Sequence, residues 1–308
     1  MLDSAIFQQI LVPFDNSDAS SRAAQTALQI AAALGSQVSF AYATTEFTNQ
    51  EDTKRTLEPA LILARSAGVK VDTHVINGYT QSIAQAIAFD ADDTGCDLIV
   101  MGTHGREGLE RLLIGSIAER VTRVAHVPVM LVRPVQNAGR YAPRIARILV
   151  AVDGSDSSHL ALLTANRLAH ALGASLEIIS VIPDVPFTVA YAYSDGGYLP
   201  PFGDDRYASD LAANSQAVIS KALGALEQTE PKAVLVNASS VPANGQRIAG
   251  AILLAAENLH ADLIVIGTHG RSGVEELLLG SVAQGVSHRA NIPVLLIRPS
   301  KLTTANKT

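Results

Sequence analysis

The chain has 308 residues, of which 48% are hydrophobic and 17% charged, and its formal net charge is -6. That length predicts two domains, each large enough to bury a core of its own. The negative charge argues against a nucleic-acid partner, because binding to a phosphate backbone relies on clustered Lys and Arg. Cys96 is the sole cysteine, which excludes an intrachain disulfide and a thiolate zinc site within one chain.

Short runs of Val, Ile and Leu alternate with Ala-rich segments of helical period, which is the pattern of successive βα units. In the first part of the chain we expect strands at 9–14, 37–44, 70–76, 98–102 and 129–133. Residues 18–34 are expected to form the first helix, with Gly35 as its C-terminal cap. In the second part the expected strands are 147–152, 175–182, 233–238, 263–267 and 294–298.

These elements predict an α/β protein with two tandem doubly wound, Rossmann-like domains. Because βα crossovers are right-handed, five such strands form a mainly parallel sheet with helices on both faces. In sheets of this kind a ligand sits beyond the carboxyl ends of the strands, where the strand order switches. That edge is therefore where functional residues are expected.

The chain repeats itself at domain length, which supports two copies of one fold. Residues 10–17 recur as 148–155, and residues 97–106 recur as 262–271. We expect a first domain at 1–138, a linker at 139–144, a second domain at 145–300 and a polar tail at 301–308.

The second copy is longer than the first. Asp15 and Asp153 are 138 positions apart, whereas Gly102 and Gly267 are 165 positions apart, so the second copy holds 27 more residues between these anchors. The stretch 184–210 is rich in Gly, Pro and Tyr, and we expect the additional residues there. The stretch is either a tolerated surface insertion, a lid over the site or a loop that binds a partner.

Two glycine patterns of identical spacing follow the fourth strand of each copy. Each has Gly-Thr-His-Gly, nine further residues and then Gly-Ser at the start of a helical run. The glycines and serines are Gly102, Gly105, Gly115 and Ser116 in the first copy and Gly267, Gly270, Gly280 and Ser281 in the second. Glycines permit positive φ and a close backbone approach to a ligand, and the amides of a helix N-terminus attract phosphate.

The glycine patterns differ from the two best-known phosphate motifs. No Lys-Ser or Lys-Thr follows the last glycine, as a Walker A motif requires, and the dinucleotide fingerprint has another spacing and follows the first strand. Main-chain amides are therefore expected to make most of the phosphate contacts. Ser116 and Ser281 would either cap their helices or donate to a phosphate oxygen.

Other polar residues stand close to these loops. Asp15 and Asp153 at the ends of the first strands would accept from ribose hydroxyls, hold a divalent cation or cap the next helix. His104 and His269 are expected to contact the loop or the ligand, since neither has a second metal ligand near it in sequence. The last two, Arg106 and Arg271, would reach phosphate or remain solvated.

The glycine patterns, Asp15, Asp153 and the closing segments 127–134 and 292–299 together resemble the universal stress protein family. Its nucleotide-binding members carry Gly-x2-Gly-x9-Gly followed by Ser or Thr, and both copies match. The resemblance implies a sheet order of 3-2-1-4-5 in each half. It also implies ATP or another adenine nucleotide, with Mg²⁺, over strands one and four.

The resemblance also assigns the expected contacts with the nucleotide. The adenine would lie near Ala43 and Pro13 in the first copy and near Val181 and Ala151 in the second. The ribose would contact Asp15 and Asp153. The phosphates would contact the glycines and serines of the two patterns, which are Gly102, Gly105, Gly115, Ser116, Gly267, Gly270, Gly280 and Ser281. The remaining expected contacts are Met101, His104, Arg106, Ile117, Ile266, His269, Arg271 and Val282.

Family members commonly pair through their last strands, which implies an intramolecular pseudo-dimer here and leaves a homodimer open. Asn16, where the family often has glycine, leaves the turn after the first strand in question. The expected role is a stress-response regulator with an unknown protein partner, whose conformation is ordered by nucleotide. The alternatives are a weak Mg²⁺-dependent ATPase or phosphotransferase, and a scaffold in which one or both sites are vestigial. No catalytic residue and no metal-ligand set stand out.

The targeting signals and membrane segments that sequence can reveal are not expected in this chain. Residues 1–14 lack the basic n-region and cleavage site of a signal peptide. No run approaches the ~20 apolar residues of a membrane span. A cytoplasmic protein without a membrane partner is therefore the expectation.

Overall fold

The computed structural model describes residues 6–45, 50–78, 81–104, 114–133, 144–182, 205–226, 231–237, 247–269 and 279–298. Within these ranges the strands are β1 Gln9–Pro13, β2 Gln37–Thr44, β3 Val71–Asn77, β4 Leu98–Gly102, β5 Val129–Val132, β6 Arg147–Ala151, β7 Ser175–Ile182, β8 Lys232–Asn237, β9 Leu263–Gly267 and β10 Val294–Ile297. The helices are α1 Asp18–Leu34, α2 Gln50–Ala67, α3 Ile83–Asp93, α4 Ser116–Val124, α5 Asp156–Leu172, α7 Asp205–Gly224, α8 Arg247–Asn258 and α9 Ser281–Arg289. No helix among these is long and apolar enough to span a bilayer.

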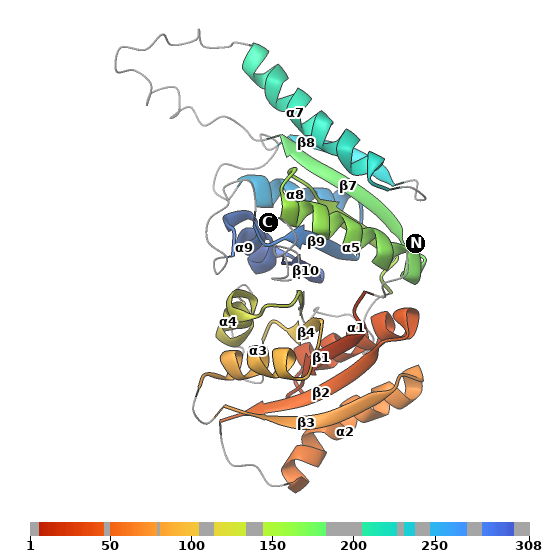
Figure 1. Ribbon diagram of the computed structural model, residues 1–308, viewed down its shortest axis with the longest axis vertical. Helices are drawn as coiled ribbons and strands as arrows, with labels where there is room; N and C mark the ends of the chain where they lie inside the picture. The colour runs from red at the N-terminus through yellow and green to blue at the C-terminus, as the bar shows by residue number, and fades with distance from the viewer. Residues whose placement is uncertain are drawn as a thin grey trace, which may run out of the picture.

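The strands form one continuous sheet in the order β3-β2-β1-β4-β5-β10-β9-β6-β7-β8 (Figure 1). Each half has the expected order 3-2-1-4-5, and its neighbouring strands are parallel. The halves join where β5 pairs with β10 in antiparallel register, with Leu131 opposite Val294. The fold class is confirmed, and the pairing through the last strands merges the two sheets into one.

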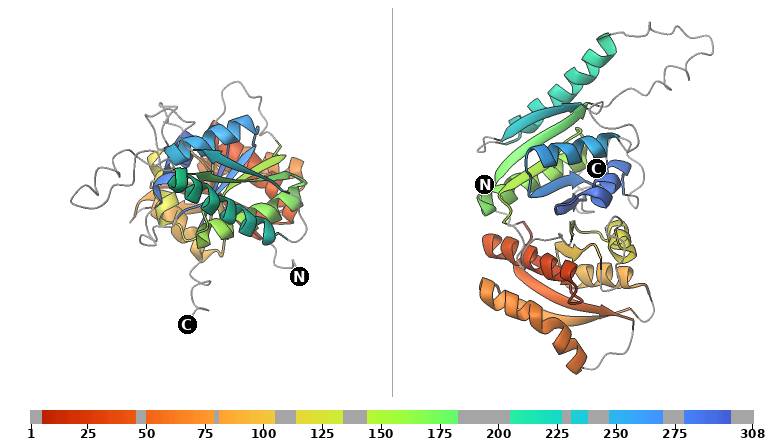
Figure 2. Two further views of the ribbon diagram at one scale, coloured as in Figure 1. Left: turned by 90° about the horizontal axis from the view of Figure 1, so that it is seen from above. Right: turned by 180° about the vertical axis from the view of Figure 1, so that it is seen from behind.

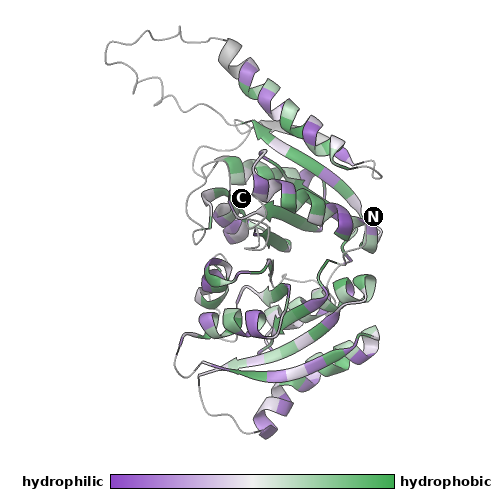
Figure 3. Ribbon diagram, viewed as in Figure 1, coloured by the Kyte–Doolittle hydropathy of each residue, from purple (hydrophilic) through white to green (hydrophobic). Residues whose placement is uncertain are grey.

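The sheet separates two hydrophobic layers, each of which runs through both halves. Buried residues of α1, α2, α5 and α7 form one layer, and buried residues of α3, α4, α8 and α9 form the other. The right-hand view in Figure 2 shows the first half and the second half end to end, and the pairing of β5 with β10 joins them. Figure 3 shows hydrophobic strands between helices whose outer sides carry the hydrophilic residues, as a sheet buried on both faces requires.

The first helix illustrates how local sequence positions an element. Ser17 accepts a hydrogen bond from the Ser20 amide at 3.2 Å and caps the helix, and Gly35 ends it at φ 72°. The observed helix confirms the predicted bounds 18–34. Both capping signals act over a short range in the sequence, which is why they could be recognised.

Other predicted limits shift by one or two residues. The strands β5 and β10 stop one residue before Arg133 and Arg298, whose side chains bond to the other half. The helix α7 begins at Asp205, so residues 205–210 at the end of the expected insertion are helical.

Some expected segments lie outside the described residues. These are the rest of the expected insertion up to 204, the linker 139–143 and the tail 301–308. The domain limits therefore stay a prediction.

Candidate functional site

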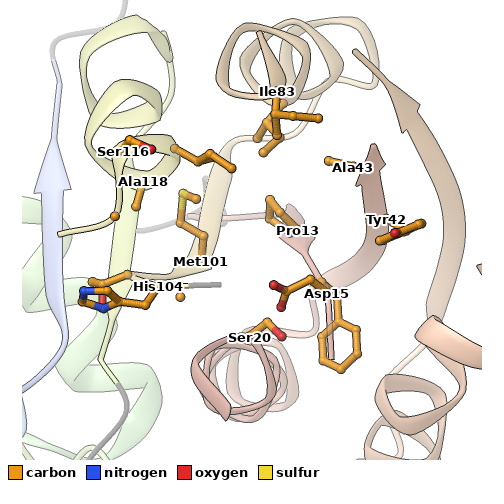
Figure 4. A pocket seen from close by; sticks show the side chains of 16 residues that line it. Pro13, Asp15, Ser20, Tyr42, Ala43, Ile83, Met101, His104, Ser116 and Ala118 are labelled. Carbon is orange, nitrogen blue, oxygen red and sulfur yellow. The ribbon is translucent and has the colours of Figure 1, made fainter. Parts of the chain in front are cut away.

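A cavity of about 500 Å³ opens at the carboxyl ends of β1, β2 and β4, bounded by α3 and the start of α4. Its volume falls in the range of about 300–1,000 Å³ typical of ligand sites. The residues that line it are Pro13, Phe14, Asp15, Ser20, Tyr42, Ala43, Ile83, Ile87, Met101, Gly102, Thr103, His104, Gly115, Ser116, Ile117 and Ala118. In Figure 4, Ile83 and Ala43 lie on one side of the space, His104 and Ser116 lie on the other, and Asp15 lies between them.

The second half has a cavity of about 310 Å³ in the corresponding place. Its lining consists of Ala151, Val152, Asp153, Ser158, Ser180, Val181, Ile248, Ile252, Ile266, Gly267, Thr268, His269, Gly280, Ser281, Val282 and Ala283. Every one of these residues is the repeat counterpart of a residue in the first cavity. The duplication therefore preserves the full ring of cavity-lining positions.

The structure brings the expected site residues together in two sets. The first cavity gathers Pro13, Asp15, Ala43, Met101, Gly102, His104, Gly115, Ser116 and Ile117. The second gathers Ala151, Asp153, Val181, Ile266, Gly267, His269, Gly280, Ser281 and Val282. Gly105, Arg106, Gly270 and Arg271 lie outside the described residues.

The helices α4 and α9 begin at the cavities without a side-chain cap. Their N-cap residues are Gly115 and Gly280, and neither helix has a side-chain hydrogen bond at this end. By contrast, Ser17 caps α1 and Ser155 caps α5. Since the first amides of any helix lack intrahelical partners, α4 and α9 present their first-turn N–H groups to the cavities.

Ser116 and Ser281 therefore do not cap their helices, and the interpretation of them as caps is wrong. Each is the first helical residue, one position after the N-cap glycine. From that position the two hydroxyls line the cavities beside the uncapped amides. The expectation that they contact a ligand is unaffected by this correction.

The described glycines of the pattern serve chain packing, and the expectation of positive φ is wrong for them. Gly115 and Gly280 have φ of -61° and -59°, and neither Gly102 nor Gly267 is in the left-handed region. A Cβ on Gly102 would lie 2.7 Å from the backbone of Ala19. The first glycine of each pattern is thus required where the strand end touches the start of α1 or α5, and the third is required where the start of α4 or α9 touches the Thr103 or Thr268 carbonyl.

The same close approach engages one of the main-chain amides that were expected to contact phosphate in each half. The Gly115 N–H donates to the Thr103 carbonyl at 2.7 Å, and the Gly280 N–H donates to the Thr268 carbonyl at 2.8 Å. These two amides are engaged within the protein. The amides left at the start of each helix are those of Ser116 and Ser281 and the residues that follow.

Asp15 and Asp153 support the turns that lead into α1 and α5. The Asp15 carboxylate accepts from the Ser17 amide at 3.0 Å, and Asp153 accepts from the Ser155 amide at 3.0 Å. The caps themselves are the two serines, so a direct capping role for the aspartates is wrong. Asn16 lies between Asp15 and Ser17 and has φ 63°, and its counterpart Gly154 has φ 87°. The turn is the same in both halves because asparagine tolerates the left-handed region.

His104 lies at the edge of the first cavity, and one of its two ring nitrogens has a hydrogen-bond partner. Its Nδ1 lies 3.0 Å from the Thr103 hydroxyl oxygen, and His269 has the same contact with Thr268 at 2.9 Å. The Nε2 atom of His104 is buried and has no hydrogen-bond partner among the described residues. A buried polar atom of this kind favours a ligand contact. No group of three or more His, Cys, Asp or Glu side chains suited to a metal occurs within the described ranges.

A sequence profile of the Universal stress protein family matches residues 7–133 and again residues 144–298. The chain belongs to the universal stress protein family. A universal stress protein of Mycolicibacterium smegmatis is 28% identical over 237 residues, which cover 77% of this chain and 72% of that one. One from Mycobacterium tuberculosis is 30% identical over 206 residues, 66% of this chain and 62% of the relative, so the match spans less than two thirds of the latter.

Two solved structures share this fold over nearly their whole length. One from Archaeoglobus fulgidus superposes with a TM-score of 0.65 at 20% identity, covering 94% of this chain and 98% of that chain. A Pseudomonas aeruginosa protein of unknown function gives 0.66 at 20% identity, covering 97% and 95%. These likenesses concern the fold, which agrees with the strand order of each half.

Several cavity residues of this universal stress protein escape sequence reasoning. Ile83 and Ile87 of α3, and Ile248 and Ile252 of α8, look like ordinary core positions on an amphipathic helix. Their i, i+4 spacing after a capping serine at Ser82 is the signal that would have found them in the first half. The other unexpected lining residues are Phe14, Ser20, Tyr42, Thr103, Ala118, Val152, Ser158, Ser180, Thr268 and Ala283.

Proposed function

We propose that this universal stress protein binds adenine nucleotide in its cavities and acts as a nucleotide-dependent regulator. The observation that carries the proposal is the uncapped N-terminus of a nine-residue helix at each cavity, with His104 or its counterpart beside it. Aligned peptide dipoles and unpaired N–H groups at such a helix start attract phosphate. An anionic ligand is therefore the chemistry that fits this end.

The opposite side of the first cavity supports an apolar, flat base. Ala43 and Ile83 line it with carbon atoms, and the Met101 side chain stands between this side and the start of α4. Asp15 lies between this side and the helix start, where a carboxylate accepts from sugar hydroxyls. Residues of three chemical types thus follow the order of base, sugar and phosphate in one nucleotide.

The regulatory part of the proposal rests on α4 and its counterpart α9. Ser116 at the start of α4 lines the first cavity, and the Thr122 and Arg123 carbonyls near its end accept hydrogen bonds from Arg298 of the other half. A ligand at the start of α4 thereby acts on a helix that also forms the junction between halves. A change at that junction is a surface that a protein partner would sense.

Isothermal titration calorimetry with ATP and Mg²⁺, together with mass analysis of nucleotide extracted from purified protein, tests the proposal. Bound adenine nucleotide and saturable heat are expected. No heat and no extracted nucleotide would overturn nucleotide binding and leave the scaffold alternative. Magnesium-dependent release of phosphate that disappears in Asp15→Ala/Asp153→Ala protein would favour the weak ATPase instead of the regulator.

A further inference from the structure

The helices α4 and α9, which begin at the two cavities, are short and lack the end signals of their neighbours. Each has nine residues, whereas an isolated helix of fewer than ~12–15 residues is marginal in water. Neither has a side-chain cap at its start, and their C-cap residues, Ala125 and Ala290, are extended. By contrast, the 17-residue helices α1 and α5 start with a serine cap and end with a left-handed glycine. The positions of α4 and α9 therefore depend on contacts from outside each helix.

The carboxyl end of α4 is held by a side chain of the second half. Arg298 is buried, and its guanidinium donates to the Thr122 and Arg123 carbonyls. These carbonyls belong to the last turn of α4, where intrahelical donors are missing, and a cation there complements the helix dipole. Arg298 thus supplies the C-terminal anchor that the sequence of α4 does not contain.

The reciprocal contact holds α9 of the second half. Arg133, which is also buried and follows β5 of the first half, donates to the Ser287 and His288 carbonyls. Each of the two helices therefore begins at the cavity of its own half and ends on an arginine of the opposite half.

The backbone next to each arginine, unlike its side chain, is bonded within its own half. The Ile297 carbonyl accepts the Thr268 amide at 2.9 Å, and Thr268 lines the second cavity. Correspondingly, the Val132 carbonyl accepts the Thr103 amide at 3.0 Å, and Thr103 lines the first cavity. A substitution of the arginine side chain leaves these main-chain hydrogen bonds in place. Its first effect is therefore on the helix of the opposite half.

We propose that Arg298 positions α4 for nucleotide binding in the first half and that Arg133 does the same for α9 in the second. Neither arginine lines a cavity, so both act through the helix that they hold. A helix that has lost this anchor can fray or shift, and ordering its first amides when phosphate binds then reduces the affinity. The inference rests on the proposed nucleotide binding. It makes the affinity of each site depend on a residue of the other half.

Hydrogen exchange across a titration with ATP and Mg²⁺ tests this proposal, because peptides from α4 and α9 differ in sequence and report the two sites separately. Arg298→Met should raise the ATP concentration that half-protects the start of α4 at least about fivefold, with a smaller change at α9. Arg133→Met should give the opposite pattern. Arg298→Lys keeps a cation at the helix end and should restore part of the affinity at α4. Arg120→Met, at an exposed position of α4, is the matched control and should shift either midpoint less than about twofold.

The crossed pattern distinguishes positioning from a general loss of stability, which would raise both midpoints together. Thermal unfolding without nucleotide shows whether each variant is folded. If Arg298→Met does not fold, Arg298→Lys takes its place and should weaken binding at α4 more than at α9.

The possible results separate this inference from the proposed function. Unchanged midpoints, equal shifts at both sites or a larger shift in the half that carries the substitution would overturn the positioning roles while leaving nucleotide binding intact. If wild-type protein shows protection at one site only, the arginine of the opposite half should be the one that shifts it. No ATP-dependent protection at either site of the wild-type protein would overturn the proposed function, and this inference with it.

Discussion

Arg133 and Arg298 are exchanged between the two halves: each follows the last strand of its own half and donates to the end of a helix in the other. Arg298 Nη2 lies 2.6 Å from the Thr122 carbonyl oxygen and 3.0 Å from that of Arg123. Arg133 donates to the Ser287 carbonyl at 3.3 Å and to the His288 carbonyl. Both side chains are buried, and burial lowers the pKa of both guanidiniums. A cation at a helix C-terminus is stabilised by the helix dipole and satisfies carbonyls that have no intrahelical donor.

The crossed arginines should stabilise the junction between the halves. Arg298→Met keeps the length of the side chain but leaves the last carbonyls of α4 without their donor, and we expect a loss of about 2 kcal/mol in unfolding free energy. The measurement is urea or thermal unfolding. Arg147→Met, at the exposed first residue of β6, is the control and should change stability by less than about 0.5 kcal/mol. Equal stability of the Arg298 and Arg147 variants would contradict the role given to the exchange.

The close packing at Gly102 gives a second prediction. Gly102→Ala places a Cβ 2.7 Å from the Ala19 backbone and 2.9 Å from the Ser20 nitrogen, so the strand end and α1 must separate. Overpacking of this kind costs about 1–3 kcal/mol, and thermal unfolding should show it. Gly224→Ala is the matched control, because a Cβ there meets nothing within 4 Å and alanine favours the helix that ends there. A Gly102 variant as stable as the Gly224 variant would refute the packing role.

A third prediction concerns His74 on β3, which lies 2.9 Å from the carboxylate of Asp90 on α3. That hydrogen bond, with the charges of Asp90 and Asp72, raises the pKa of His74 above its ordinary value of 6.5, although burial opposes the shift. A raised folded-state pKa adds stability that is fully present below the pKa of the unfolded chain and is lost as the pH rises through the folded value. The contribution of His74 should therefore fade above neutral pH.

The pH dependence can be isolated by comparing His74→Gln with wild type. The difference in thermal midpoint between them should be larger near pH ~6 than near pH ~9. Asp90→Asn removes the charged partner and should flatten the dependence in the same way. A difference that stays constant across this range would show that His74 acts by packing alone.

How far the sequence predicts this molecule depends on the range of the interactions involved. The helix 18–34 could be delimited because Ser17 and Gly35 act within one turn of its ends. The first strand's Asp15 and the helix start at Ser116 could be placed at one cavity because parallel strands end at the same edge. Family resemblance supplied the strand order, which the register of β1 with β2 and β4 confirms.

Contacts between distant segments could not be predicted in this way. Arg298 bonds to Thr122, which is 176 positions away, and nothing in the segment that holds Arg298 marks it for that contact. The glycine pattern predicts the right location but the wrong backbone geometry. Gly102 is needed because any larger residue would collide with Ala19 of α1. Likewise Ile83 enters the cavity through the rotation of α3 on the sheet, which periodicity alone does not fix.

The uncapped start of α4 leads to a last prediction in which stability and binding move in opposite directions. Ser116→Asp places a carboxylate at the first helical position, where it interacts favourably with the helix dipole and should stabilise the nucleotide-free protein by about 0.3–1 kcal/mol. The same charge occupies the place proposed for phosphate, so ATP binding to the first site should weaken about tenfold or more. Ser116→Ala tests the hydroxyl without adding charge and should change both quantities less. Thermal unfolding without nucleotide and calorimetry with ATP measure the two effects on one preparation. An aspartate variant that is stabilised yet binds ATP as tightly as wild type would show that the phosphates do not lie at the start of α4.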